Sequence, residues 1–195
     1  HKEYRRQRQM CIRDRGMTRD GIPYTGFLYA GLMIAPGDDP DRDIKTLEFN
    51  CRMGDPETQP IMMRVKSDLL DVLEHAVDGT LDRADITWDR RTALGVVLAS
   101  HNYPNTPRTG DVIRGLPADA DDCMVFHAAT ELDGEDTKTT GGRVLCVTAL
   151  GDSVKMARDR VYEAIDGIHF DGRQYRSDIG WRALKPSQQK PKSNA

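Results

Sequence analysis

Short apolar runs separated by turn residues dominate the second half of the chain, and they restrict its fold more than any other feature. The runs cover residues 93–99 (ALGVVLA), 111–113, 124–128 and 143–150 (RVLCVTAL), with Pro, Gly and Asp between them. Such short, bounded runs are typical of strands. They predict a small antiparallel sheet or barrel.

One helix is predicted among these strands. Ser153 can cap its first turn, and Gly167 can end it. Five apolar residues between them recur at helical spacing and form the expected buried face: Val154, Ala157, Val161, Ala164 and Ile165. The second half therefore combines a sheet with a helix.

The first half begins with a predicted antiparallel hairpin. Residues 25–34 (TGFLYAGLMI) are apolar and bounded by prolines, which favours a buried strand. Residues 37–43 contain four Asp and form the expected turn, and residues 45–50 (KTLEFN) form a second short strand.

A single long helix is predicted after the hairpin. Residues 55–58 supply an acidic start with a proline suited to the first turn, and Gly79 is a suitable stop. The apolar stripe between them consists of Ile61, Met62, Val65, Leu69, Val72, Leu73 and Ala76. The polar residues 80–91 are predicted to be a linker at a domain boundary.

The charge distribution argues against a nucleic-acid partner. The 195 residues carry a net charge of −3, yet residues 1–19 hold seven basic residues against two acidic ones. Residues 185–195 add three Lys and no acid, so residues 20–184 are strongly acidic. A nucleic-acid-binding protein normally concentrates positive charge on its folded part.

The sequence also does not indicate a membrane-spanning or secreted protein. No stretch approaches about 18 apolar residues, and the Arg-rich beginning lacks an apolar core typical of a signal peptide. The four Cys are scattered without a C-x-x-C spacing, which argues against a zinc module. Reduced thiols fit a cytoplasmic location.

The densest candidate site is residues 48–59 (EFNCRMGDPETQ). Glu48 and Asn50 are two positions apart on a strand, so both side chains should share a face while Phe49 enters the core. A carboxylate and an amide oxygen suit Mg²⁺, Arg52 suits a phosphate, and Gly54 lets the backbone approach a ligand. Spacing alone favours the alternative of a solvated strand edge, because the pattern is weak.

A second candidate is the loop at residues 103–111 (YPNTPRTGD), in which Arg108 could reach a phosphate or carboxylate. The alternative is a connection between strands that the prolines make rigid. The five His do not approach metal-ligand spacing, and no Rossmann or Walker loop is present.

Several longer motifs carry a family resemblance. They occur in the order DGIPYTGFLYAGLM (20–33), EFNCRMGDPETQP (48–60), LGVVLAS (94–100), YPNTPRTGD (103–111), GGRVLCVTALG (141–151) and DIGWRAL (178–184). Together they resemble the phosphoribosylamine–glycine ligase family over residues 16–184.

The resemblance implies an α/β (α+β) fold in which the C-terminal part of an ATP-grasp core precedes a small, mostly antiparallel β domain. Residues 17–85 would form the nucleotide- and metal-binding part, and residues 86–184 the C-terminal domain. Residues 1–16 would be a leader foreign to the family, and residues 185–195 a disordered tail. The family's N-terminal substrate domain is expected to be missing.

The resemblance also implies a reaction, in which ATP and glycine give an acyl phosphate that 5-phosphoribosylamine converts to glycinamide ribonucleotide. Glu48 and Asn50 match the family's metal-binding pattern for Mg²⁺ or Mn²⁺. Arg52 would contact phosphate, Gly54 would lie at the nucleotide, and Arg108 would face the substrate cleft. The complete enzyme is expected to be a cytoplasmic monomer.

Two alternatives remain open at this point. The chain could belong to another ATP-grasp carboxylate–amine ligase, or it could be a non-catalytic interaction module derived from one. In either case we expect this chain alone neither to bind ATP tightly nor to turn over.

Overall fold

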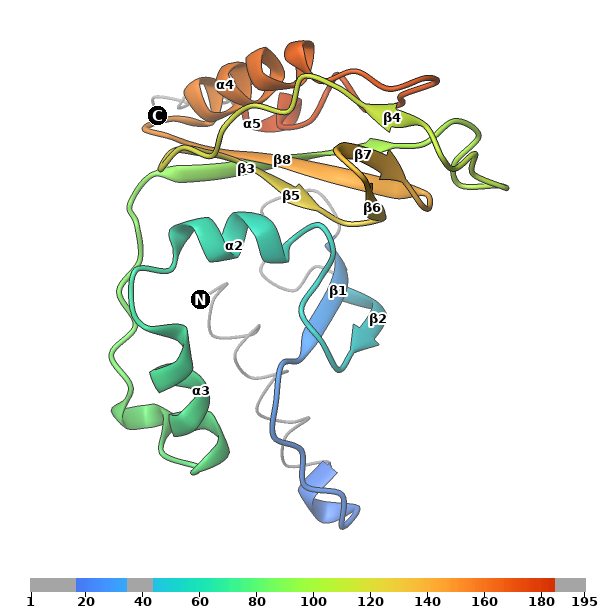
Figure 1. The fold of residues 1–195 in the computed structure, drawn as a ribbon. Coiled ribbons are helices and arrows are strands. Elements are labelled where there is room, and N and C mark those ends of the chain that lie inside the picture. The colour runs from blue at the N-terminus through green and yellow to red at the C-terminus, as the bar shows by residue number, and fades with distance from the viewer. Residues whose placement is uncertain (1–16, 35–43, 185–195) are drawn as a thin grey trace, which may run out of the picture. The chain divides into compact units, whose positions relative to one another are not determined.

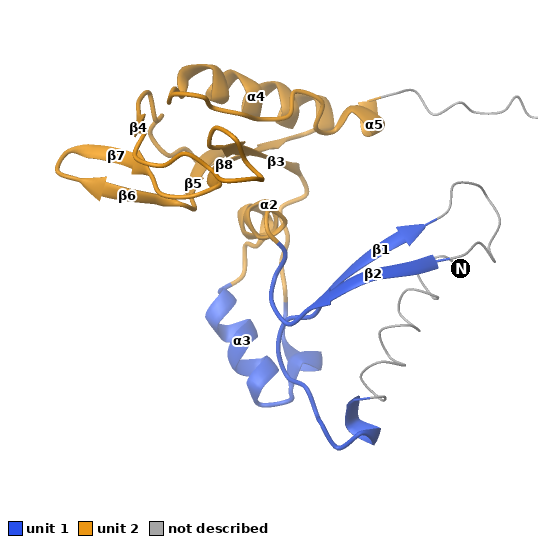
Figure 2. Cartoon of the chain, turned by 90° about the vertical axis from the view of Figure 1, so that its right-hand side faces the viewer, with its two compact units in different colours: residues 1–54, 68–85 blue, residues 55–67, 86–195 orange. Residues whose placement is uncertain are grey.

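The computed structural model describes residues 17–34 and 44–184 (Figure 1). The chain divides into two compact units (Figure 2). Unit 1 comprises residues 1–54 and 68–85, and unit 2 comprises residues 55–67 and 86–195. The predicted leader (1–16), turn (37–43) and tail (185–195) lie outside the described residues.

The centre of unit 2 is a three-stranded antiparallel sheet. β8 (Arg143–Gly151) lies between β3 (Thr92–Ala99) and β5 (Cys123–His127). Every residue of β8 after the first is buried, which explains its continuous apolar run. The strands predicted at 93–99, 124–128 and 143–150 are confirmed to within one residue at each end.

Helices cover both faces of this sheet (Figure 1). α4 (Val154–Gly167) packs on one face, where Leu94, Val96 and Leu98 of β3 belong to the same buried cluster as the helix. α2 (Thr58–Arg64) lies on the other face, where a Cβ at Gly95 would come within 3.1 Å of the Pro60 ring. A small residue at 95 therefore lets α2 approach the sheet.

The helix α4 confirms its sequence prediction in detail. The Ser153 side chain accepts a hydrogen bond from the Met156 backbone N–H at 3.2 Å, as a capping residue should. The side chains of Ala157, Val161 and Ile165 are fully buried. In the sequence, the apolar spacing and the capping residue both predicted a helix here, and the structure contains both features.

The sequence predicted only part of a second antiparallel sheet in unit 2. Its strand order is β4 (Val112–Ile113), β7 (Asp136–Thr139) and β6 (Thr130–Asp133). Only β4 was predicted. The β6–β7 hairpin carries a single large apolar side chain, Leu132, which is 78% exposed, so no hydrophobic pattern revealed it. The two separate sheets also mean that the described strands of unit 2 form no barrel.

The prediction of one long helix from its start at residues 55–58 to its stop at Gly79 is wrong. The chain forms α2 and then α3 (Leu69–Val77), with an extended break between them. Val65 has a ψ of 122° and pairs with Trp88 in an antiparallel bridge, while the Asp68 side chain caps α3 by accepting from Leu70 N–H. Local capping and strand pairing at 65–68 therefore interrupt a continuous apolar stripe.

The end of α3 agrees with its sequence signal. Gly79 has a φ of +69°, a conformation that glycine adopts without strain. A short 3₁₀ turn, η1 (Leu81–Arg83), follows within the predicted linker. At the other end of unit 2, the backbone of Gln174 pairs with Ala99, and α5 (Trp181–Leu184) ends the described chain.

Unit 1 contains the predicted hairpin. β1 (Tyr29–Ile34) pairs antiparallel with β2 (Ile44–Asn50), although β1 begins four residues later than expected. The register shifts between Gly31 and Leu32, and Leu47 is the extra residue on β2. Phe49 does not enter a core as predicted but is 48% exposed, because the described residues of unit 1 supply no buried apolar layer for it.

Among residues 17–34 and 44–184, no helix combines the length and the apolar character that a bilayer crossing requires.

Candidate active site

The strand β2 places Glu48 and Asn50 on one face, as the sequence predicts. They follow the bulge at Leu47, and their backbone partners on β1 are Gly31 and Tyr29. A Cβ at position 31 would lie 3.1 Å from the Glu48 Cγ, so glycine leaves room for the Glu48 side chain. Within the described residues, neither the Glu48 carboxylate nor the Asn50 amide has a side-chain hydrogen bond or ion pair.

This pair offers two oxygen ligands of the kind that Mg²⁺ takes. The described residues contain no group of three or more His, Cys, Asp or Glu that could hold a metal on its own. Mg²⁺ commonly takes only one or two protein ligands and completes its coordination with water and phosphate oxygens. A partnerless carboxylate beside an amide therefore fits a cation that is shared with a phosphorylated substrate.

The next residues of the candidate site follow β2 directly. Arg52 is exposed, and its Nη1 donates to the backbone carbonyl of the neighbouring Met53 at 2.8 Å. Gly54 is buried. A single bond to an adjacent carbonyl leaves most of the Arg52 guanidinium for other acceptors.

Tyr24 was not predicted as part of this region. Its phenol donates to the Phe27 carbonyl at 2.6 Å. Desolvation, followed by the charge and hydrogen bonding of the Cys51 thiol, raises the pKa of Tyr24, so the phenol lies beside the segment that follows β2. The motif around Tyr24 contributes to the family resemblance, but no spacing rule connects it to Cys51.

Arg108 lies in unit 2, in a different unit from Glu48, Asn50, Arg52 and Gly54. Its Nε donates to Asp111 Oδ2 at 2.9 Å, and its Nη2 is 3.8 Å from Asp171 Oδ2. The hydrogen bond to Asp111 is the main cause of the raised pKa of Arg108. Arg108 is therefore paired with carboxylates of its own unit.

Sequence reasoning also missed a cleft of about 610 Å³ in unit 2. Its charged residues are Arg143, the first residue of β8, and Arg176. Arg143 Nε donates to the Tyr103 hydroxyl at 3.0 Å, and its Nη1 donates to the Asp55 carbonyl at 2.7 Å. The residues that meet there are far apart in the chain, which is why no local motif indicated the cleft.

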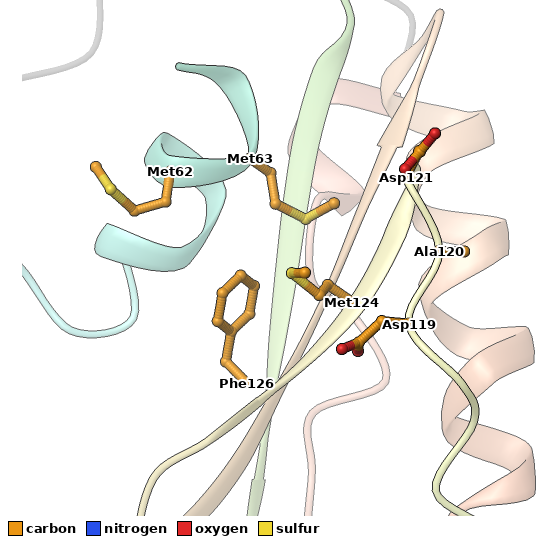
Figure 3. Close-up of a pocket in the computed structure, with 7 residues that line it drawn as sticks. All are labelled: Met62, Met63, Asp119, Ala120, Asp121, Met124 and Phe126. Carbon is orange, nitrogen blue, oxygen red and sulfur yellow. The ribbon is translucent and has the colours of Figure 1, made fainter. Parts of the chain in front are cut away.

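A second pocket of unit 2, about 380 Å³ in volume, lies between α2 and β5 (Figure 3). Met63 and Met124 extend toward each other across it, and the Phe126 ring lies beside them. Asp119 and Asp121 supply its only carboxylates. The pocket offers an adaptable apolar surface, and the arrangement suggests no catalytic chemistry.

Two family models match the chain. The model described as phosphoribosylglycinamide synthetase, C domain, matches residues 93–182. The model described as phosphoribosylglycinamide synthetase, ATP-grasp (A) domain, matches residues 5–58. The second match begins inside residues 1–16, and the assignment of these residues to a leader stays a prediction.

Curated relatives agree with the family models. The chain is 62% identical over 171 residues to a phosphoribosylamine–glycine ligase of Ralstonia nicotianae, covering 88% of this chain and 40% of the relative. It is 53% identical over 176 residues to the same enzyme of Escherichia coli O157:H7, covering 89% of this chain and 40% of the relative. The chain thus spans about 40% of the length of these relatives.

Solved structures give the same result for the fold. The crystal structure of a phosphoribosylamine–glycine ligase from Thermotoga maritima matches with a TM-score of 0.71 and 34% identity, covering 84% of this chain and 39% of that one. The biotin carboxylase domain of the Hydrogenobacter thermophilus 2-oxoglutarate carboxylase matches with a TM-score of 0.55 and 15% identity, covering 80% and 34%. The second likeness concerns the fold alone.

Proposed function

Because the chain belongs to the phosphoribosylamine–glycine ligase family, we propose that it forms part of an enzyme that joins glycine to 5-phosphoribosylamine. The products are glycinamide ribonucleotide, ADP and phosphate, in de novo purine biosynthesis. The observation that carries the proposal is the ordered series of family motifs, which the two family models cover from residue 5 to 58 and from 93 to 182.

The reaction has two steps that need no covalent bond to the protein. The glycine carboxylate attacks the terminal phosphorus of ATP, which gives glycyl phosphate and ADP. The amine of 5-phosphoribosylamine then attacks the glycyl carbonyl carbon, the amide forms, and phosphate leaves. The side chains of the protein therefore bind and orient the substrates and stabilise the negative charge that moves between them.

Glu48 and Asn50 would hold the cation that accompanies ATP, either Mg²⁺ or Mn²⁺. Their shared face on β2 and the space left by Gly31 support this assignment. When bound, such a cation neutralises charge on the terminal phosphates during transfer. Arg52 would donate to a phosphate oxygen, and Gly54 would let the backbone approach the nucleotide.

Arg108 would face the substrate cleft and bind a carboxylate or phosphate of a substrate. Its guanidinium is bound to Asp111, so contact with a substrate carboxylate or phosphate would compete with that ion pair. The free thiols of Cys51, Cys123 and Cys146 support the further proposal of a cytoplasmic location.

The metal assignment is tested by Glu48→Ala and Asn50→Ala in a complete enzyme that carries this segment. Loss of a metal ligand should lower metal-dependent formation of ADP by at least about 100-fold. Glu74→Ala, which removes an exposed carboxylate from α3 in the same unit, is the control and should leave the rate unchanged. Near-normal activity of Glu48→Ala would remove Glu48 from the ligand set.

A further inference from the structure

The β1–β2 hairpin of unit 1 has two faces of different chemical character. Residues that are opposite each other on paired antiparallel strands share a face, and the faces alternate along a regular strand. By this rule the proposed metal ligands Glu48 and Asn50 lie on one face. The other face is apolar apart from one threonine and comprises Ala30, Leu32, Ile34, Ile44, Thr46 and Phe49. The polar face is therefore the side of the hairpin on which a charged ligand would bind.

The bulge in β2 adds Lys45 to this polar face. Lys45 and Glu48 are three positions apart, and on an unbroken strand such residues point to opposite faces. The extra residue Leu47 changes the alternation, because Glu48 pairs with Gly31 while Lys45 pairs with Met33, two residues further along β1. Lys45 therefore shares a face with Glu48, which strand alternation alone would not predict.

The separation of Lys45 and Glu48 suits a ligand that both residues contact. Because their partners on β1 are two residues apart, the two Cα atoms are separated by about 7 Å. The Lys45 side chain is exposed, and its four-carbon stem is flexible. Mg²⁺ holds its oxygen ligands at roughly 2.0–2.1 Å, so phosphate oxygens on a cation at Glu48 would lie within reach of the Lys45 ammonium.

The charges along β2 match a chain of phosphate groups. Lys45 precedes the proposed metal ligands on the strand, and Arg52 follows the end of the strand. The Glu48 carboxylate offsets part of the charge of a divalent cation, so a bound polyphosphate needs further positive groups to balance its negative charge. A lysine ammonium binds phosphate as a point charge and does not need the planar geometry that an arginine fork requires.

We propose that Lys45 is a further nucleotide-binding residue, whose ammonium donates to a phosphate oxygen of the nucleotide bound at Glu48 and Asn50. The inference rests on the proposed function, in which the nucleotide is ATP, and it adds a cationic residue outside the segment 48–59. The competing explanation is that Lys45 only protects an exposed strand from pairing with other chains, as lysines on edge strands do.

The test uses a complete enzyme that carries this segment, and MgADP is the probe in calorimetry without glycine. We expect Lys45→Met to weaken MgADP binding about tenfold or more, because one charge-assisted bond to phosphate is lost. Lys45→Arg should keep most of the affinity, because it keeps the charge. Lys155→Met removes an exposed lysine from α4 of unit 2 and should leave the affinity unchanged.

A second control keeps the positive charge on β2 but moves it to the apolar face. Thr46→Lys, added to Lys45→Met, should not restore MgADP binding, because position 46 faces away from Glu48. Steady-state kinetics give an independent measurement. Lys45→Met should raise the KM for ATP and change kcat little, because the contact to phosphate is present both before and during phosphoryl transfer.

Three results would overturn the proposal: wild-type affinity of Lys45→Met for MgADP, restoration of binding by Thr46→Lys, or an equal loss of affinity in Lys155→Met. If Lys45→Met aggregates, the more polar Lys45→Gln decides, and its wild-type affinity would identify the lysine as protection of the strand edge. The outcome is separate from that of the proposed function. An enzyme that binds MgADP but forms no glycinamide ribonucleotide would contradict the proposed function, and the binding data would still decide the role of Lys45.

Discussion

The two units of the chain differ in how they bury apolar side chains. In the described residues, every buried apolar side chain lies between Leu94 and Phe170, within unit 2. In the described residues of unit 1 the apolar side chains are half-buried or exposed, and Met33 and Leu47 are 56% and 62% exposed. Unit 2 therefore has a hydrophobic core of its own. Unit 1 has none in its described residues, although its strand β2 carries the proposed metal ligands Glu48 and Asn50.

This difference can be followed with separate signals. Both tryptophans, Trp88 and Trp181, lie in unit 2, so tryptophan fluorescence reports on that unit alone. Far-ultraviolet circular dichroism reports on helices and strands of both units. Comparing the two signals in the same variant shows which unit a substitution affects.

The largest effect is expected from removing a core side chain of unit 2. Leu98 is fully buried between β3 and α4, so Leu98→Ala should lower the free energy of unfolding by about 2–5 kcal/mol. Leu47→Ala, at an exposed position of unit 1, should change it by less than about 0.5 kcal/mol. Urea titration followed by tryptophan fluorescence measures Leu98→Ala, and the same titration followed by far-ultraviolet circular dichroism measures Leu47→Ala. Equal effects of the two substitutions would contradict the division into one unit with a core and one without.

The next largest effect on stability is expected from alanine substitutions at two glycines with nearly the same φ angle. Gly115 in unit 2 has a φ of +73° and Gly79 in unit 1 a φ of +69°, so alanine is strained at both. A Cβ at 115 would also lie 1.9 Å from the Gly167 carbonyl oxygen, whereas a Cβ at 79 meets no atom within 4 Å.

We therefore expect Gly115→Ala to lower the free energy of unfolding of unit 2 by roughly 2–4 kcal/mol, since overpacking adds to the backbone strain. Gly79→Ala should cost about 1 kcal/mol locally in α3 and leave the tryptophan transition unchanged. Thermal unfolding recorded by both signals separates the two outcomes. A tryptophan transition that shifts equally in both variants would show that the close contact at 115 is unimportant.

A third prediction concerns the carboxylate of Asp89, which lies shortly after the point at Ile86 where unit 2 resumes in the sequence. The Asp89 side chain is 6% exposed, and Arg91 binds it through Nε and Nη2, with Lys66 at 3.5 Å. Hydrogen bonds from the Arg91 side chain and then from its backbone N–H, together with the positive charges of Arg91 and Lys66, hold the pKa of Asp89 well below its usual value of 3.8. A lowered pKa in the folded state means that the charged form is favoured by folding.

The stabilisation from Asp89 is therefore fully present above about pH 4 and is lost as the pH falls below that value toward the folded-state pKa. Asp89→Asn should be less stable than wild type at pH 7, and the difference should shrink to less than half near pH 2. Asp178→Asn, which breaks an exposed ion pair, should show a smaller difference at pH 7. A stability difference for Asp89→Asn that is constant from pH 7 to pH 2 would contradict the assignment.

Sequence patterns predicted those helices and strands whose local residue pattern agrees with the way they pack in the folded chain. β8 is mostly apolar after Arg143 because helices cover both faces of its sheet, and α4 has both its cap and its apolar stripe. The break between α2 and α3 was not predictable from the stripe, because it depends on pairing of Val65 with Trp88, 23 positions away in the chain. The β6–β7 hairpin was missed because its strands are polar apart from Leu132, so that they carry no apolar alternation.

The same distinction applies to the sites. The shared face of Glu48 and Asn50 followed from strand alternation, which is a local property. The cleft around Arg143 could not be predicted, because Asp55, Tyr103 and Arg143 meet only through the packing of α2 and the loop after β3 against the sheet. The space that Gly31 and Gly142 leave for neighbouring side chains was equally invisible before the strand register was known.

The smallest effects are expected at the two side-chain helix caps, one in each unit. Ser153 caps α4 of unit 2, and Asp68 caps α3 of unit 1 by accepting from Leu70 N–H at 2.8 Å. Replacing either residue by Ala removes one hydrogen bond from a first turn and should cost about 1 kcal/mol. In unit 2 the loss is coupled to the buried face of α4, so Ser153→Ala should move the tryptophan transition to lower urea. In α3, which buries none of its residues, Asp68→Ala should reduce the helical circular dichroism and leave the tryptophan transition in place. If Asp68→Ala moved the tryptophan transition as far as Ser153→Ala does, α3 would have to unfold together with the core of unit 2, and the contrast between the units would not hold.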